Sequence, residues 1–302
     1  MALQLLSPAK INLFLDVISK RPDGFHNIFT VFERIDLFDR ITLEVTKNGI
    51  RLETDNEELP RGRDNIAYKA AELFLKNFKI KKGVYIKVEK HIPIAAGLGG
   101  GSSNAATVLL GMNRLFGLSL GKEEIMPLAK KVGSDVPFFT EETSFAIGEG
   151  RGDIITPLKT NKRFWHILVC PNIRVYTKEI YNELEEKKNN VTANFTDNYN
   201  KKSNLLNIWE KLNLTKNTRD SINTLFNLSS CFLYNKLESI VEDKIKEIRQ
   251  VKIALENYGV KPMMSGSGPT VFGFVNLRKE AEIIRDKLAS QYNWQIFLTK
   301  TY

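Results

Sequence analysis

A glycine-rich run in the first third of the chain constrains the fold most. Residues 93–104 read Pro-Ile-Ala-Ala-Gly-Leu-Gly-Gly-Gly-Ser-Ser-Asn, so four glycines and two serines stand directly before an amphipathic segment. Glycine lets the backbone turn through positive φ and approach a ligand closely, and successive N–H groups can then converge on one anion. A helix that begins at the serines adds its unpaired N–H groups and the positive end of its dipole. The run therefore predicts a phosphate-binding loop.

The helix after this loop is indicated by its apolar spacing. From Ser103 to Phe116, apolar side chains recur at helical intervals, and Ser102 or Ser103 is a suitable N-cap. The loop lacks the lysine of the Gly-x-x-x-x-Gly-Lys-Ser/Thr pattern. Glu123 and Glu124, where a dinucleotide fingerprint needs an acidic residue, open a helix instead. The alternative is a glycine-rich turn that only lets a helix pack closely, because glycine motifs alone have many false positives.

Length and periodicity predict a two-domain α+β protein. The 302 residues suffice for two cores, and strands and helices mix without regular βαβ alternation. Periodicity fades over 148–157, so we expect a boundary near Thr160, between domains 1–160 and 161–302. The polar, Asn-rich segment 185–202 is interpreted as an exposed insertion. Strands are predicted at 1–7, 41–45, 84–88, 165–169, 271–275 and 295–298, and helices at 64–78, 103–116, 122–132, 203–212, 237–258 and 278–288.

Composition narrows the classes of partner. No apolar run is long enough to cross a bilayer, and residues 1–7 lack the basic start and long apolar core of a signal peptide. Cys170 and Cys231 stand far apart without metal-ligand spacing, so we expect buried thiols of a reducing cytoplasm rather than a zinc site or disulfide. A net charge of +9 suits nucleic acid, acidic membranes or phosphorylated metabolites without choosing among them.

Three further segments place polar side chains where a scaffold rarely needs them. Lys10 and Asn12 alternate on one face of an otherwise apolar strand, where buried polar groups need partners; the alternative is an edge strand with one solvated face. Asp135 follows a helix end, where a carboxylate is either a helix cap or a functional group. Residues 264–270 form a second small-residue turn, which is a plain tight turn, a partner of the first glycine loop or a contact for phosphate.

In combination, these segments resemble the GHMP kinase superfamily, which contains galacto-, homoserine, mevalonate and phosphomevalonate kinases. Residues 8–12, 93–103 and 264–270 match its N-terminal Pro-x-x-x-Asn-like segment, its central glycine-serine loop and its C-terminal small-residue loop, in that order. The resemblance implies a two-domain α+β fold, with a ribosomal-protein-like N-terminal domain and a ferredoxin-like C-terminal domain. It also implies an ATP-dependent kinase with an alcohol acceptor, and Mg²⁺ to screen the triphosphate.

Other segments are similar to one subfamily of these kinases. Its acceptor is a cytidine-diphosphate-linked methylerythritol, phosphorylated on its 2-hydroxyl in the non-mevalonate route to isoprenoid precursors. The subfamily-specific parts are the tripled glycine and the run Asp23-Gly24-Phe25-His26. Phe25 stands where the subfamily more often has tyrosine, so a stacking face survives and a hydroxyl contact does not.

The resemblance implies roles for individual residues. Asp135 takes the proton of the attacking hydroxyl or orients that hydroxyl, and Lys10 keeps the carboxylate ionised and offsets charge on the transferred group. The residues implied to bind ATP are Pro93, Ile94, Ala95, Ala96, Gly97, Leu98, Gly99, Gly100, Gly101, Ser102, Ser103 and, in the adenine region, Asn65. The resemblance does not say which side chain binds Mg²⁺; Ser102 is one candidate.

The residues implied to bind the alcohol are Asn12, Phe25, His26, Thr177 and Tyr181. Phe25 and Tyr181 would form the two walls of a stack on cytosine, and His26 would read the edge of the base. Asn12 would hydrogen-bond the polyol or Asp135. Without the surrounding motif, His26 would be a loop histidine with no ligand.

Three alternatives stay open at this point. Another kinase of the superfamily, of the homoserine or mevalonate type, would share the phosphate loop and not need residues 23–26. A nucleic-acid-binding protein on the same scaffold fits the positive charge, although the chain keeps Lys10 and Asp135 and has no basic patch interleaved with aromatic residues. The third is a catalytically dead ATP-binding module. We expect small-molecule partners, no nucleic acid, no membrane and a cytoplasmic location; the sequence predicts no oligomeric state.

Overall fold

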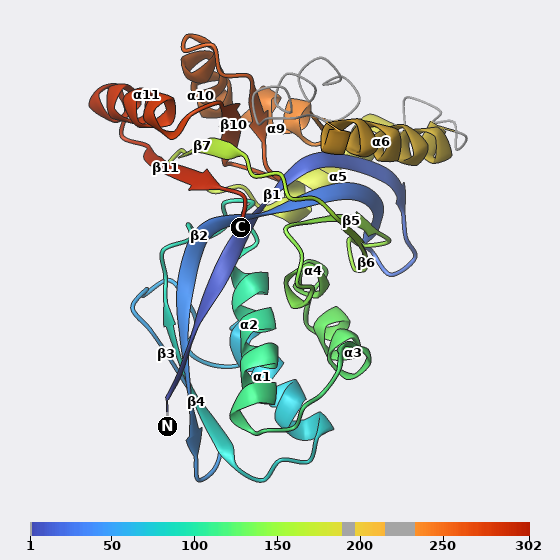
Figure 1. The fold of residues 1–302 in the computed structure, drawn as a ribbon, viewed down its shortest axis with the longest axis vertical. Helices are drawn as coiled ribbons and strands as arrows, with labels where there is room; N and C mark the ends of the chain where they lie inside the picture. The colour runs from blue at the N-terminus through green and yellow to red at the C-terminus, as the bar shows by residue number, and fades with distance from the viewer. Residues whose placement is uncertain (1, 189–196, 215–232) are drawn as a thin grey trace.

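The computed structural model describes residues 2–188, 197–214 and 233–302, which form two sheets with associated helices (Figure 1). The larger sheet has the strand order β3-β4-β2-β1-β8, and β5 extends it from β2 and β6 from β5. Two long strands, β1 and β2, form an antiparallel hairpin that runs through both parts of the molecule in Figure 1. The strands of this sheet are β1 (Leu3–Lys20), β2 (His26–Thr46), β3 (Ile50–Thr54), β4 (Gly83–Glu89), β5 (Phe145–Glu149), β6 (Ile154–Leu158) and β8 (Tyr234–Asn235).

Helices from the first half of the chain cover one face of the lower part of this sheet. The central helix, α2, packs on β1 and β2 and is flanked by α1, α3 and α4 (Figure 1). A Cβ at Gly111, in the middle of α2, would lie 2.5 Å from the side chains of Leu5 and Leu43, so glycine is what lets this helix approach the sheet. The four helices are α1 (Ile66–Asn77), α2 (Gly100–Leu115), α3 (Lys122–Val132) and α4 (Val136–Thr140).

A second, antiparallel sheet has the strand order β11-β7-β10-β9, with α10 and α11 packed against it (Figure 1). Its core is filled by aliphatic side chains such as Ile167, Val251 and Leu288. The elements of the second half outside the large sheet are β7 (Trp165–Cys170), β9 (Pro262–Met264), β10 (Val271–Val275), β11 (Gln295–Lys300), α5 (Thr177–Lys188), α6 (Asp197–Leu214), α9 (Glu238–Lys244), α10 (Lys246–Glu256) and α11 (Arg278–Gln291).

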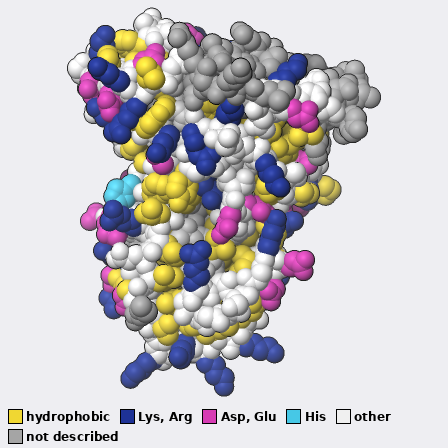
Figure 2. Space-filling view, in the orientation of Figure 1, with side chains coloured by type: hydrophobic (Ala, Val, Ile, Leu, Met, Phe, Trp, Pro, Cys, Tyr) yellow, Lys and Arg dark blue, Asp and Glu magenta, His cyan; other side chains and the backbone are white. Residues whose placement is uncertain are grey.

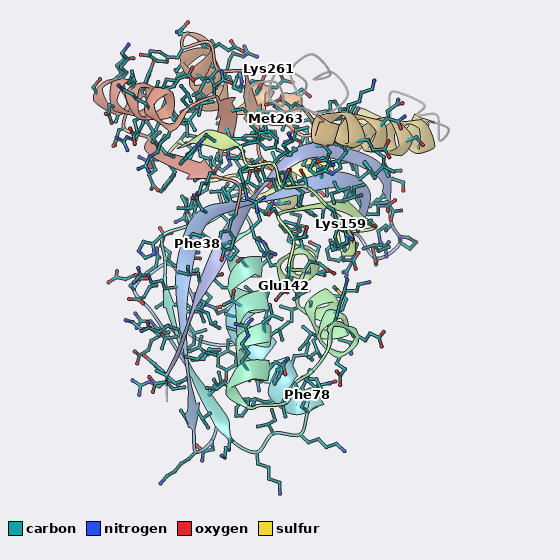
Figure 3. The ribbon with its side chains drawn as sticks, in the orientation of Figure 1. Phe38, Phe78, Glu142, Lys159, Lys261 and Met263 are labelled. Carbon is teal, nitrogen blue, oxygen red and sulfur yellow. The ribbon has the colours of Figure 1, made fainter. Side chains whose placement is uncertain are left out.

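Strand contacts and a shared core join the two halves of the chain. β8 pairs in parallel with β1, and Ile35 of β2 forms a bridge with Thr301 after β11. Phe14 of β1, Phe272 of β10 and Met263 of β9, the last labelled in Figure 3, belong to one core cluster. The predicted boundary near Thr160 falls between β6 and β7 and stays a prediction.

Most predicted elements are confirmed, and the α+β class with them. The start of the central helix differs, because α2 begins at Gly100 rather than Ser103. Gly99 before it takes the left-handed conformation, and no side chain caps the helix. Ser102 and Ser103 therefore lie inside the first turn and are not the N-cap.

Three segments of the second half correct the sequence interpretation. Residues 148–157, where periodicity fades, contain the turn of the β5–β6 hairpin. The described parts of 185–202 are helical, in α5 and α6, and residues 189–196 lie outside the described residues. Later in α6, Trp209 packs on Phe145 with ring centroids 4.9 Å apart. The helix predicted at 237–258 is two helices, because Ile245 takes an extended conformation between α9 and α10.

The helices, the surface charge and the described cysteine can be compared with what composition indicated. Within the described ranges, every helix is too short or too polar to cross a membrane. On the face shown in Figure 2, basic side chains are spread over both parts of the molecule with acidic ones among them. Cys170 is buried beside Thr270, and burial raises the pKa of its thiol to about 12; Cys231 lies outside the described residues.

Candidate active site

The glycine loop turns sharply just before α2. Ala95, Gly97 and Gly99 have positive φ values of 53°, 74° and 69°, so every second residue takes the left-handed conformation. Such alternation turns backbone N–H groups toward a common point, where they can bind an anion. Residues 93–102 line a cavity of about 360 Å³, together with Asn65 and Lys90. The cavity and the first turn of α2 have the geometry that could hold an anion, and the binding of phosphate here stays a prediction.

Lys10 ties this loop to the central strands. Its Nζ donates to the Gly97 carbonyl at 2.9 Å and to Asn12 Oδ1 at 2.7 Å, and lies 3.7 Å from Asp135 Oδ2. Lys10 is only 4% exposed and Asn12 only 3%, so the alternative of an edge strand with a solvated face is wrong. Burial lowers the pKa of the Lys10 ammonium, and the Asp135 carboxylate offsets part of that drop.

Asp135 immediately precedes α4 and faces the same space. Its side chain makes no capping hydrogen bond to the helix, which favours a functional group over a helix cap. Arg34 of β2 fixes the other end of α4, because it donates to the carbonyls of Phe138 and Glu141. The Phe138 ring also stacks on Phe32, with centroids 4.8 Å apart. The short helix therefore holds Asp135 in a set position beside Lys10.

A larger cavity of about 700 Å³ lies on the other side of the glycine loop. Lys10 and Asp135 line it together with residues from the β1–β2 hairpin, α5 and the loop after β9. Four residues, Ala95, Gly97, Gly99 and Ser102, border both cavities. The phosphate loop is thus the common wall, and the lysine–carboxylate pair lies next to it.

Phe25, His26 and Tyr181 line the larger cavity, and the part that they line is called its aromatic end. Phe25 is 49% exposed, and the Arg151 guanidinium lies 4.9 Å from its ring centroid. His26 packs on Tyr181 with centroids 4.8 Å apart, and His26 Nε2 lies 2.6 Å from Glu185 Oε1. Phe25 and Tyr181 thus each lie against a different neighbour, and their joint stack on a base stays a prediction.

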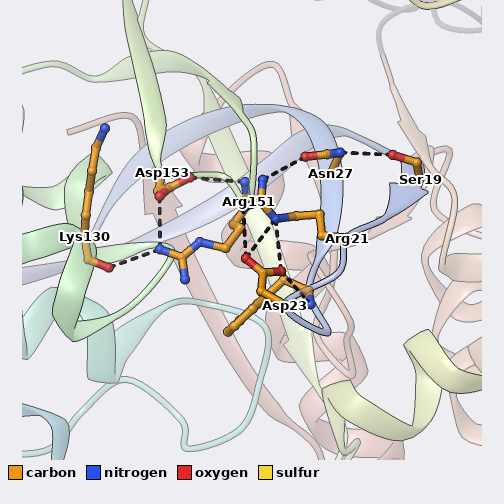
Figure 4. Close-up of polar contacts among 8 residues, drawn as sticks. Ser19, Arg21, Asp23, Asn27, Lys130, Arg151 and Asp153 are labelled. Carbon is orange, nitrogen blue, oxygen red and sulfur yellow. Dashed lines mark hydrogen bonds and ion pairs between the residues drawn. The ribbon is translucent and has the colours of Figure 1, made fainter.

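A polar network holds the turn that carries Phe25 (Figure 4). Arg151 donates to Asp153 Oδ2 at 3.1 Å and to the Lys130 carbonyl at 3.2 Å. Arg21 forks onto Asp23, whose Oδ1 accepts from the backbone N–H of Phe25 at 3.2 Å. The hairpin turn after β5 and the turn after β1 therefore meet at this wall of the cavity.

The second small-residue loop packs against the first. Ser265 Oγ donates to the Gly97 carbonyl at 3.1 Å and accepts from the Asn12 backbone N–H at 3.3 Å. Ser267 Oγ lies 2.7 Å from Thr177 Oγ1 at the start of α5. The reading of residues 264–270 as a partner of the glycine loop is confirmed, and the plain tight turn is excluded.

Comparisons with known proteins agree with this geometry. The family model described as GHMP kinases N terminal domain matches residues 65–142, and that described as GHMP kinases C terminal matches residues 212–293. A 4-diphosphocytidyl-2-C-methyl-D-erythritol kinase from Clostridium botulinum (strain Kyoto / Type A2) is 39% identical over 97% of this chain and 98% of its own. The kinase of the same name from Alkaliphilus metalliredigens (strain QYMF) is 40% identical over 99% and 96%. This chain belongs to the 4-diphosphocytidyl-2-C-methyl-D-erythritol kinase family.

Two solved structures share the fold of this chain. A crystal structure of 4-(cytidine 5'-diphospho)-2C-methyl-D-erythritol kinase is 28% identical, with a TM-score of 0.75 over 99% of this chain and 100% of that one. Homoserine kinase from Cytophaga hutchinsonii is 17% identical, with a TM-score of 0.70 over 100% and 94%, which shows a common fold alone. The kinase described here thus has the two-domain GHMP fold and is a phosphotransferase with an alcohol acceptor.

Most of the residues predicted for the kinase site line one of the two cavities, and three of them are placed differently from expectation. Ser103 is fully buried; its N–H donates to the Gly99 carbonyl, its hydroxyl accepts from Ser7, and it does not line the smaller cavity. Asn65 lines the smaller cavity but caps α1 through the Ala67 N–H.

For Asn12, the predicted hydrogen bond to Asp135 is wrong, because both ends of the amide are engaged elsewhere, whereas its contact with the polyol stays a prediction. Its Oδ1 accepts from Lys10, and its Nδ2 donates to Thr30 Oγ1 at 2.8 Å, so it does not hydrogen-bond Asp135. Asn12 still lines the larger cavity. In this structure Asn12 therefore helps to orient the Lys10 ammonium.

Sequence reasoning missed a buried carboxylate that supports the phosphate loop. Asp39 of β2 is fully buried and accepts from the backbone N–H groups of His91 and Ile92 at 2.8 and 2.9 Å. It also accepts from Asn104 Nδ2 at 2.8 Å and pairs with Lys90. Asp39 therefore fixes both ends of the glycine run. An acidic residue inside an apolar strand was the available signal.

Gly97→Ala is expected to loosen the junction of the two loops. An added Cβ would lie 2.3 Å from the Ser265 carbonyl oxygen and would force alanine into a φ of 74°. We expect the free energy of unfolding to fall by about 1–3 kcal/mol and the KM for ATP to rise. Gly62→Ala is the control, because its Cβ would meet no atom within 4 Å and Gly62 lines neither cavity. Denaturant unfolding and initial rates measure both effects, and unchanged values in Gly97→Ala would contradict the packing described.

Proposed function

We propose that this kinase transfers the γ-phosphoryl group of ATP to the 2-hydroxyl of 4-diphosphocytidyl-2-C-methyl-D-erythritol. One observation carries the proposal: the phosphate loop is the common wall of two cavities, and Lys10 and Asp135 lie beside that wall. ATP in the smaller cavity would direct its γ-phosphate across the loop, and an alcohol in the larger one would meet it there. In-line transfer needs the two oxygens on opposite sides of the phosphorus.

Asp135 is the residue we propose to act on the alcohol. Its carboxylate accepts the proton of the 2-hydroxyl as that oxygen attacks the phosphorus, or holds the hydroxyl in line for attack. The Lys10 ammonium lies 3.7 Å from that carboxylate, where it can hold the carboxylate in place for either role. The Lys10 ammonium also stabilises negative charge on the transferred group, from a site where water is largely excluded.

The residues around the shared wall fit Mg²⁺ bound chiefly through the nucleotide. Among the described residues, no three His, Cys, Asp or Glu side chains gather as a ready-made cage. Mg²⁺ commonly takes one or two protein oxygens and completes its shell with substrate phosphates and water. Ser102 borders both cavities and offers a hydroxyl for this purpose. When bound, the ion would screen the charge of the triphosphate.

The aromatic end of the larger cavity is the proposed site for cytosine. Phe25 offers a half-exposed ring face for stacking, and His26 and Tyr181 lie across the same cavity. The kinase family supports this substrate, and the other GHMP alcohols would leave the aromatic end without a function. We propose small-molecule partners only, and a cytoplasmic setting. Phosphorus NMR of the product tests the site of transfer, and a phosphate on any other hydroxyl would contradict it.

His26→Ala is expected to raise the KM for the cytidyl alcohol by about 10-fold or more, since the variant loses a hydrogen bond to the base and a packing partner of Tyr181. The KM for ATP should change little, because His26 does not line the smaller cavity. Initial rates with each substrate varied in turn give the two values. Equal rises in both would remove His26 from the base site.

A further inference from the structure

A hydrogen bond between α5 and the start of β2 crosses one side of the larger cavity. His26 Nε2 and Glu185 Oε1 lie 2.6 Å apart, and the other carboxylate oxygen of Glu185 pairs with Lys20. Tyr181 is one turn before Glu185 on the same helix face and packs on the His26 ring. His26 is only 9% exposed. Helix α5 thus holds its imidazole in two ways, through the packing of Tyr181 on the ring and through the hydrogen bond of Glu185 to Nε2.

The charge of Glu185 decides which nitrogen of His26 carries a proton. Hydrogen bonds from Lys20 and His26 hold the pKa of Glu185 below its ordinary value, so the carboxylate is ionised near neutral pH. An ionised carboxylate only accepts hydrogen bonds, so Nε2 must be the N–H donor. In a neutral imidazole Nδ1 is then an acceptor. Nδ1 has no hydrogen-bond partner among the residues that the structure describes.

An acceptor at this place distinguishes between pyrimidine bases. Cytosine carries an amino group at C4, which donates, whereas uracil carries a carbonyl oxygen there, which accepts. Nδ1 can accept a hydrogen bond from the amino group of cytosine. Opposite the carbonyl oxygen of uracil it would make no hydrogen bond, because both atoms are acceptors. A site that hydrogen-bonds one group discriminates strongly against an analogue that leaves its buried polar atom unpaired.

We propose that Glu185 is a positioning residue that fixes the tautomer of His26 and thereby makes the kinase select cytosine over uracil. This inference rests on the proposed function, because it takes the aromatic end of the cavity as the base site. A structural ion pair would need only Lys20, which is itself largely exposed, and exposed ion pairs contribute little to stability. A purely structural ion pair with Lys20 does not explain why Glu185 also contacts Nε2 of the buried His26 ring.

Glu185→Leu tests the proposal, with Glu186→Leu as its matched control. Glu186 is the next residue on α5, is exposed and does not line the cavity. The readout is kcat/KM for the cytidyl alcohol and for its uridyl counterpart. The wild type and the control should prefer the cytidyl compound by about 10²-fold or more. Glu185→Leu should lose at least about 10-fold of that preference through a higher KM for the cytidyl alcohol, with the KM for ATP unchanged.

Two other outcomes would overturn the proposal, and they are distinguishable. If the wild type turns over the cytidyl alcohol and Glu185→Leu lowers kcat/KM for both alcohols by the same factor, the role is structural and this inference alone fails. If the wild type does not turn over the cytidyl alcohol at all, the proposed function fails and takes the inference with it.

The tautomer can be read without any turnover. The chain has three histidines, His26, His91 and His166, so ¹⁵N NMR of the ring nitrogens gives few signals, and His26→Ala assigns the relevant pair. We expect the Nε2–H form in the wild type and in Glu186→Leu, and a mixture of forms in Glu185→Leu. A wild-type spectrum of the Nδ1–H form would contradict the proposal.

Discussion

Asp135→Asn is expected to lower kcat by about 10²- to 10⁴-fold, the range in which a positioned acid or base contributes to proton transfer. The amide is close in size to the carboxylate but cannot accept a proton, and it gives Lys10, 3.7 Å away, no counter-charge. Both KM values should change much less than kcat, because the two cavities keep their shapes.

The measurement is steady-state kinetics with each substrate varied in turn. Asp286→Asn is the matched control, because it makes the same change in charge on α11, where it lines neither cavity. Near-normal turnover in Asp135→Asn would rule out both the base and the orienting role, and the geometry would then need another explanation.

Lys10→Met is expected to lower kcat by about 10²- to 10³-fold, the usual loss when one donor to developing negative charge is removed. The substitution also leaves the Gly97 carbonyl without the ammonium that holds the loop, so the KM for ATP should rise. Wild-type rates at increasing pH test the same residue in another way. Because burial lowers the pKa of Lys10, activity should fall on the alkaline side below the ordinary lysine value of 10.5.

The free energy of unfolding should change with pH in the direction opposite to activity, because of the same lysine. The pKa of Lys10 is lower in the folded chain than in the unfolded one, so burial of the charged form destabilises the fold at low pH. That penalty disappears as pH rises toward the unfolded value of 10.5. Unfolding measured over this interval should therefore show a rising contribution in the wild type that Lys10→Met lacks. If Lys10→Met kept a kcat within a few-fold of wild type and the same fall in activity at alkaline pH, the role given to Lys10 would be contradicted.

The short-range parts of this site are readable in the sequence. Glycines before a periodic segment predicted the loop before α2, and the period of a strand placed Lys10 and Asn12 on one face. The helix start at Gly100 was missed because Gly99, in the left-handed conformation, replaced a serine cap. Propensity favours serine at that position, and the glycine backbone overrode it.

The long-range parts needed the fold. Glu185 and Arg151 sit in segments without clear periodicity, and the sequence does not show which residues they will meet across the cavity. Asp39 lies 52 residues from the His91 N–H that it accepts from, so its role depends on how β2 pairs with β4. The helix predicted at 203–212 is confirmed within α6, but its start at Asp197 was missed because the Asn-rich composition of 185–202 indicated an insertion rather than a helix.

Release of ADP with Mg-ATP and a panel of alcohols tests the central claim most directly. The panel contains the cytidyl-methylerythritol compound, free methylerythritol, homoserine and mevalonate, with Asp135→Asn as the control enzyme. We predict turnover with the cytidyl compound alone and its loss in the control. Turnover with an alcohol that carries no nucleotide would keep the kinase but contradict the cytosine site, and release of ADP with none of them would contradict the proposed reaction.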